Sequence, residues 1–449
     1  MNFPRRRNRS LFFIFGGVSL TLPGSMKFVL ETLFVLIALR LVALAFRPVV
    51  HARAAKAISD QKQATKPDVV VTKVAKRHHS RLKWMLIALA TCFAAFLGMA
   101  LFLDYSKELG RKGLIDALII SLLPLPIWIV LTQWIHRFKT EPLRMLTAAF
   151  IWGAIAASFF SIVANNLVVH FLVSHYGRRV APLGAVLSAP CVEETFKGTF
   201  LLFLFFSKSA RFDDAIDGIV YATMIGLGFA VTENVFYFGR AIVAGSTAVV
   251  VGMFVVRHVM GPFLHPFFTA MFGIGLGFSR QTDNGVVKFI APVGGFFLAM
   301  FLHYAWNLTV LTAIQFPIVY FYFYFVFMLP AFIGALMLIV FQLGREGAII
   351  GERLLPEVQS GILTAEELKR IATVNGRLRA TTRALCKGGL KPWLVQRKFH
   401  QVASELAFHR FRVAHGTSKR DDALEAAFVQ HLRECLPQRV NLKGQPQPA

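Results

Sequence analysis

Two adjacent glutamates, Glu193 and Glu194, lie inside a long apolar stretch of the chain, with Lys197 one helical turn further on. Between residues 181 and 206 these three are the only charged side chains. A charged side chain at membrane depth costs about 3 kcal/mol or more, and such residues usually mark a working site. The pair therefore predicts a functional site whose other members lie on neighbouring segments.

Later segments supply further polar pairs at the same spacing of four. A spacing of four places two side chains on one face of a helix. Four helices can therefore each turn one polar face toward a shared interior. The pairs are Glu193 with Lys197, Phe229 with Glu233, His265 with Thr269, and His303 with Asn307; Asn234 follows Glu233 directly.

Side chains of these types can hydrolyse a peptide bond. A positioned glutamate can act as a general base toward water, and Lys197 can keep one carboxylate ionised. Adjacent carboxylates repel each other, so the second can remain protonated and act as an acid. A histidine and an asparagine can donate hydrogen bonds to the oxyanion that forms when water adds to a carbonyl. Which of Glu193 and Glu194 is the base stays open at this point.

The same side chains also suit a divalent metal with an open position for water. The spacing does not decide between direct activation of water and a metal-assisted reaction. We expect no cofactor, with zinc as the alternative. The ligands of the metal site would be Glu193, Glu233, His265 and His303.

The composition is that of an all-α polytopic membrane protein. Of 449 residues, 55% are hydrophobic and only 16% are charged, whereas a soluble domain carries about 25% charged residues. Apolar runs long enough to cross a bilayer recur along the chain. We predict about nine transmembrane helices, at 27–46, 84–103, 114–135, 146–172, 181–206, 215–238, 257–279, 288–311 and 316–342.

The net charge of +25 is concentrated in two regions. Of the 49 Lys and Arg residues, ten lie in 47–83 and eighteen in 343–449. Basic segments next to transmembrane helices stay in the cytoplasm, so we predict a cytoplasmic C-terminus. Anionic lipids at the cytoplasmic face are a sufficient partner for this charge, and no nucleic acid is expected. The oligomeric state stays open.

The predicted organisation has five parts. They are an N-terminal segment with the first span (1–46), a basic cytoplasmic linker (47–83), two accessory transmembrane helices (84–145), a catalytic transmembrane core (146–342) and a cytoplasmic helical tail (343–449). In the tail, Thr364 and Glu367 have the spacing of a capping box. We expect a helix from there through Leu378, a second helix over 393–414 and a third over 420–435.

The motifs of the core resemble the PrsW family of membrane proteases, which are related to the CAAX prenyl endopeptidases and the bacterial ABI proteins. Each motif alone is weak, but four in order on consecutive membrane segments are specific. They read EETFK at 193–197, GLGFAVTEN at 226–234, Arg257 with HPFFT at 265–269, and HYAWN at 303–307. The resemblance says nothing about the first 145 residues.

The resemblance implies an intramembrane peptidase of the inner (cytoplasmic) membrane that cleaves single-pass membrane proteins, such as an anti-sigma factor. Relatives are described as glutamate-type hydrolases and also as metalloproteases. Position in the motifs implies a base among Glu193 and Glu194, assistance from Glu233 and His265, and an oxyanion site of His303 and Asn307. The supporting residues would be Lys197, Asn234, Thr269 and Arg257.

Depth in the bilayer gives a further expectation. At ~1.5 Å of rise per residue, the predicted span ends place Glu193, Glu233, His265 and His303 in the outer half of the membrane. Cleavage near the outer face would follow from that placement.

Other interpretations compete with a protease. Buried Glu, His and Lys also build proton relays in transporters and channels, although the internal repeats that transporters usually show are not evident here. Lone polar residues in membrane helices commonly serve packing, which is the expectation for Asn165, Asn166, His170 and His258. For Arg257 we expect an interfacial anchor or a substrate contact, and for Thr269 a partner of His265.

Overall fold

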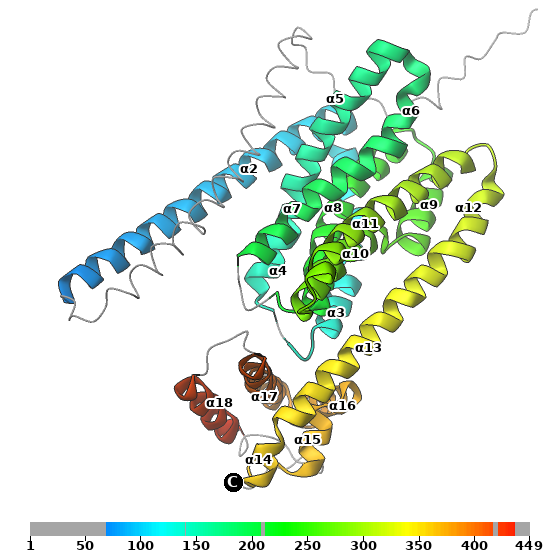
Figure 1. The fold of residues 1–449 in the computed structure, drawn as a ribbon. Helices are drawn as coiled ribbons and strands as arrows, with labels where there is room; N and C mark the ends of the chain where they lie inside the picture. Colours follow the sequence, from blue (N-terminus) through cyan, green and yellow to red (C-terminus); the bar gives the residue numbers. More distant parts are fainter. Residues whose placement is uncertain (1–68, 140, 208–211, 416–420, 436–449) are drawn as a thin grey trace, which may run out of the picture. The chain divides into compact units, whose positions relative to one another are not determined.

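A computed structural model describes residues 69–139, 141–207, 212–415 and 421–435, and every regular element in these ranges is a helix (Figure 1). The all-α class is therefore confirmed. The predicted span at 27–46 and the predicted segment 1–46 lie outside the described residues.

Six segments of the described chain are long and apolar enough to cross a membrane, which confirms a multi-pass membrane protein. They are Phe93–Ile135, Leu143–Tyr176, Ala215–Val243, Thr247–Gln281, Gly285–Ala313 and Pro317–Arg353. The predicted count of nine is not confirmed. The predicted spans 84–103 and 114–135 lie on one continuous helical stretch. Helix α2 (Val69–Leu122) continues through the expected loop with a kink at Gly110, and α3 (Leu125–Ile135) follows it.

The chain divides into two compact units. Unit 1 comprises residues 1–128 and 144–323, and unit 2 comprises 129–143 and 324–449. These two units are defined by contacts between residues. The five predicted parts were defined by composition, so the structure does not test their boundaries, which stay a prediction.

Helix α8 (Ala215–Val243) is the centre of unit 1, where α10 (Leu264–Gln281) packs against both α8 and α11 (Gly285–Ala313) (Figure 1). Asp214 and Asp217 form a capping box at the start of α8, as their position predicts. Gly218 allows the two helices to touch: a Cβ there would lie 2.0 Å from the carbonyl oxygen of Gly273. Small residues permit this approach in membrane helices.

Three π-helical turns interrupt the helices of unit 1. One (η1, Trp152–Ala157) joins α4 (Leu143–Ile151) to α5 (Ser158–Tyr176). The second (η3, Gly184–Ser188) follows the short helix α6 (Ala181–Leu183) and precedes α7 (Ala189–Phe206). The third (η4, Val255–Met260) lies between α9 (Thr247–Phe254) and α10. Such turns are frequent at functional sites.

The third π-helical turn corrects the predicted span at 257–279. The helical segment begins at Thr247 and breaks at Gly261 before α10, as Pro262 and Pro266 would favour. Helix α8 likewise extends to Val243, beyond the predicted end at 238. The depths assumed for Glu233 and His265 are therefore wrong, because both residues lie further from the ends of their apolar segments, Val243 and Thr247, than the predicted spans placed them.

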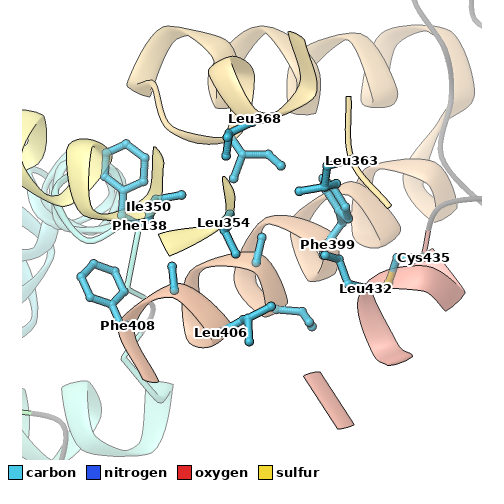
Figure 2. Packing of buried hydrophobic residues seen from close by; sticks show 14 of the residues in the cluster. Phe138, Ile350, Leu354, Leu363, Leu368, Phe399, Leu406, Phe408, Leu432 and Cys435 are labelled. Atoms are coloured by element: carbon cyan, nitrogen blue, oxygen red, sulfur yellow. The ribbon is translucent and has the colours of Figure 1, made fainter. Parts of the chain in front are cut away.

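Unit 2 is built on the last apolar segment. Helix α12 (Pro317–Phe323) ends unit 1, and the chain continues through η5 (Tyr324–Met328) into α13 (Leu329–Arg353). Five shorter helices follow: α14 (Leu355–Gln359), α15 (Ala365–Ile371), α16 (Val374–Gly388), α17 (Leu390–Ala414) and α18 (Asp422–Cys435). Figure 2 shows their shared core, which includes Ile350, Leu354, Phe399 and Leu406.

The tail helices agree with the sequence in part. Thr364 and Glu367 form the predicted capping box. The helix that follows ends at Ile371, however, and not beyond Leu378, because Thr373 caps a new helix with its side chain. Gly389, at φ 79°, separates α16 from α17, a conformation that glycine adopts without strain.

We predict that Gly218→Ala lowers the free energy of unfolding by about 1–3 kcal/mol or more, because the added methyl overpacks the contact of α8 with α10. Gly294→Ala on α11 is the matched control, since a Cβ there meets nothing within 4 Å. Unfolding in mixed detergent micelles, followed by circular dichroism, measures both. Equal stability of the two variants would contradict this packing.

Candidate active site

Glu194 and Lys197 form a buried ion pair at the centre of unit 1. Lys197 is fully buried and Glu194 is 1% exposed. The Lys197 ammonium donates to Glu194 Oε1 at 2.7 Å. His303 Nδ1 lies 3.0 Å from the same oxygen, and Thr269 donates to Oε2 at 2.9 Å. Helices α7, α10 and α11 thus meet on one carboxylate, which is held by three donors.

A second polar cluster surrounds Glu233 on α8. Its Oε2 lies 2.5 Å from His265 Nε2 and accepts a hydrogen bond from Arg257 Nη2. The Arg257 Nε donates to Asn234 Oδ1, and the guanidinium lies 4.3 Å from the ring centre of Tyr237. Arg257, a predicted supporting residue for which we expected an interfacial anchor or a substrate contact, pairs with a predicted site residue.

Lys197 joins the two clusters. Its ammonium lies 3.1 Å from His265 Nδ1 and 4.0 Å from the centre of the Phe229 ring. A cation over an aromatic face is stabilised there. The contacts therefore run without interruption from Arg257 through Glu233, His265 and Lys197 to Glu194.

Glu193 differs from its neighbour because it is only partly engaged. Its Oε2 is buried without a hydrogen-bond partner among the described residues. Lys197 Nζ and His303 Nε2 each lie 3.8 Å away, beyond hydrogen-bond range,. Its Oε1 accepts only a long contact of 3.5 Å from Asn165 Nδ2. Glu193 is thus the carboxylate that can still accept a proton or bind water.

A cavity of about 490 Å³ opens in front of this carboxylate. Glu193, Glu233, His265, His303 and Asn307 all line it, whereas Glu194 and Lys197 lie behind its wall. The remaining lining is mostly apolar, as is usual for pockets that take organic ligands. The cavity is large enough to admit an extended peptide segment beside Glu193.

Asn307 and Thr269 are positioned differently from the expectation. Asn307 Nδ2 donates to the carbonyl of Ala185 at 3.0 Å. An amide nitrogen carries two hydrogens, so a second hydrogen remains for a ligand in the cavity. Thr269 binds Glu194 and not His265.

The charges of the site do not balance within it. Three carboxylates (Glu193, Glu194, Glu233) face two permanent cations (Lys197, Arg257), which leaves one negative charge in excess when the histidines are neutral. Lys197 and Arg257 each contact one of the other two carboxylates directly. Glu193 is therefore the carboxyl group of the three without a cation in hydrogen-bond range.

Comparison with known proteins gives a family for this part of the chain. Residues 141–335 match the PrsW family of intramembrane metalloproteases, and this range contains every site residue described above. Over these residues the chain is similar to the PrsW family.

Curated PrsW proteases are similar over a shorter stretch. The identity is 30% over 102 residues with Protease PrsW of Geobacillus kaustophilus and 30% over 123 residues with that of Clostridioides difficile. These matches cover 22% and 27% of this chain, and 42% and 50% of the relatives. The chain thus spans about half the length of the curated relatives it matches. No solved structure gives a significant match.

The family description names a metalloprotease. Glu193, His265 and His303 each offer a ligand atom within 4.8 Å of the others, but Glu233 of the predicted set is paired with Arg257 and His265. Catalytic zinc needs three protein ligands. His265 Nε2 contacts Glu233 and its Nδ1 contacts the Lys197 ammonium. His265 would therefore have to give up one of these contacts to complete a set of three ligands.

The structure gathers the sequence-predicted residues of the PrsW motifs into one site, from five helical elements. Sequence reasoning missed two members. Asn165, assigned to packing, contacts Glu193, and Tyr237 lies against Arg257. Tyr237 follows Glu233 by four residues, so the same spacing that found the other pairs could have found it.

We predict that Lys197→Met destabilises the protein by about 3–5 kcal/mol, because Glu194 is left as an uncompensated buried charge. The double variant Lys197→Met/Glu194→Gln should recover much of that loss, since the charge is removed with its partner. Thermal unfolding of the single and double variants measures the coupling. A loss below about 1 kcal/mol, typical of an exposed pair, would contradict the buried ion pair.

Proposed function

We propose that this protein is an intramembrane peptidase in which Glu193 activates water. The observation that carries the proposal is the unpartnered carboxylate oxygen of Glu193 at the wall of a large cavity. The match of residues 141–335 to the PrsW family supports the reaction class.

In the proposed step, a water molecule lies beside Glu193 Oε2 and His303 Nε2. Glu193 takes one proton as the water oxygen attacks the carbonyl carbon of the scissile peptide. The tetrahedral intermediate then collapses, the C–N bond breaks, and Glu193 returns the proton to the departing amine. The products are a new carboxyl group, which keeps the second proton of the water until it ionises, and a new amino group, and the enzyme is regenerated. Positioned acid–base groups of this kind contribute about 10²–10⁴ in rate.

His303 is suited to orient the water. Its Nδ1 faces the Glu194 carboxylate, which only accepts hydrogen bonds, so this nitrogen carries the proton,. The Nε2 is then an acceptor, directed at the gap of 3.8 Å before Glu193. In this arrangement Asn307, rather than His303, supplies the donor for the oxyanion, through its second amide hydrogen.

Glu194 and Lys197 position the other groups without touching the substrate. Glu194 fixes the ring of His303, and Lys197 holds Glu194 and His265 in place. This division assigns the base role to the first glutamate of the pair and a positioning role to the second.

The substrate follows from where the cavity lies. Most of its lining residues come from segments long and apolar enough to span a bilayer, so the proposed substrate is a membrane-embedded segment of a single-pass protein, with an anti-sigma factor as one example. We also propose insertion in the inner membrane with a cytoplasmic C-terminus, on the distribution of basic residues. A transporter is less well supported, because the polar contacts of the described site residues gather around one cavity.

We predict different results for the two glutamates. Glu193→Gln should lower cleavage of a reconstituted single-pass substrate by at least about 10²-fold and leave thermal stability unchanged or higher, since it removes an unpaired charge. Glu194→Gln should lower both, because Lys197 loses its partner. Glu352→Gln, at an exposed position of unit 2, is the control. Full cleavage by Glu193→Gln would refute its role as base.

Removal of metal ions distinguishes direct activation of water by Glu193 from a metal-dependent reaction. We expect the purified, reconstituted wild type to retain its cleavage rate after exhaustive chelation, because only two ligands are available without breaking the contacts of His265. Loss of cleavage that is restored by zinc would show that His265 changes partners and ligates a metal.

A further inference from the structure

Unit 2 carries an exposed face that its own core does not use, on the helical hairpin formed by α16 and α17. Leu378, Leu385, Leu390 and Leu394 are between 44% and 63% exposed. One side of α16 is formed by residues that recur at helical spacing, which are Leu378, Thr382, Leu385 and Cys386. Four exposed leucines on one short hairpin are more than scattered surface apolarity, which needs no explanation when residues occur singly.

The same hairpin has a charge of a single sign. Between residues 374 and 398 the chain has seven Lys and Arg residues and no Asp or Glu. Lys387 and Lys391 lie exposed beside Leu385 and Leu390. The Arg397 guanidinium lies 4.8 Å from the ring centre of Trp393. Basic residues beside exposed leucines and a tryptophan are typical of a helix that lies in the headgroup region of a membrane.

Contacts within unit 2 place this hairpin beside the end of a transmembrane segment. The segment Phe93–Ile135 ends two residues before Arg137, which donates from Nη1 to the carbonyl of Val374 at the start of α16. Arg377 Nη1 donates back to the carbonyl of Arg137. Burial, together with the nearby positive charge of Arg397, lowers the pKa of His136 to about 4. Both helices of the hairpin therefore approach the residues that leave the membrane.

We propose that the exposed face of the α16–α17 hairpin docks on the anionic lipid headgroups of the membrane that the protein spans. Charge complementarity selects this occupant, because basic residues attract anionic lipids and the leucines can insert among the headgroups and first acyl carbons. The docking would hold unit 2 against the bilayer. It is independent of the chemistry proposed for Glu193.

The native Cys386 lies exposed on this face and provides the probe. The full chain, with its other cysteines replaced, carries an environment-sensitive dye on Cys386. It is reconstituted in vesicles of phosphatidylcholine alone or with phosphatidylglycerol. We expect a blue shift in the anionic vesicles that high salt reverses, because salt screens surface charge.

The variant Lys387→Gln/Lys391→Gln should show a smaller lipid-dependent shift. At ~1 kcal/mol per basic residue, the apparent partition constant of this face for anionic lipid should fall by about 30-fold. The matched control Lys369→Gln/Arg433→Gln removes the same charge from exposed positions elsewhere in unit 2 and should leave the shift intact. An equal response of the two double variants would overturn the proposal, since net charge alone would then explain the effect.

Hydroxyl-radical footprinting of the unlabelled wild type gives a second readout that needs no cysteine replacement. Oxidation of Leu390 and Leu394 should fall in anionic vesicles. Unchanged oxidation in both lipids would overturn the proposal. The proposal would also be overturned if protection of these leucines increased with the number of protein molecules per vesicle and did not depend on lipid charge. The face would then be an interface between copies of the chain.

Discussion

The fold of unit 1 depends on a buried ion pair between Lys197 and Glu194. A lysine with no exposure to solvent is costly in an apolar environment unless its charge is paired and its donors are used. This lysine meets Glu194 at 2.7 Å, His265 at 3.1 Å and the face of Phe229 at 4.0 Å. Helices α7, α8 and α10 must therefore keep their relative positions for the charge to remain stable, and α11 joins them through His303.

The same pairing explains why one carboxylate of the site remains reactive. Lys197 and Arg257 satisfy Glu194 and Glu233, whereas the third carboxylate, Glu193, has its cation Lys197 only at 3.8 Å, beyond hydrogen-bond range,. The cavity lies on the side of Glu193 and not of Glu194. Packing and chemistry thus use different members of the glutamate pair: one stabilises the helices, and the other faces the space where a substrate would bind.

The sequence predicts that these polar side chains lie close together, because spacing of four on apolar segments has few physical meanings, and the structure brings them together. The capping residues Asp214 and Thr364 were also predictable from local chemistry. The start of the α10 segment at Thr247 was not, since the whole stretch from Thr247 to Gln281 is apolar enough for a span to begin at several positions. The partner of Thr269 depends on contacts between helices, which spacing within one helix cannot give.

The account rests on Glu193 as the working carboxylate, and chemical rescue tests it most directly. Glu193→Ala opens room for a small carboxylate at the wall of the cavity of about 490 Å³, whereas Glu194→Ala leaves a gap enclosed by protein. With a reconstituted substrate, added formate should restore cleavage by Glu193→Ala in a concentration-dependent manner and should not restore it for Glu194→Ala. Rescue of Glu194→Ala alone, or full cleavage by Glu193→Ala without formate, would contradict the account.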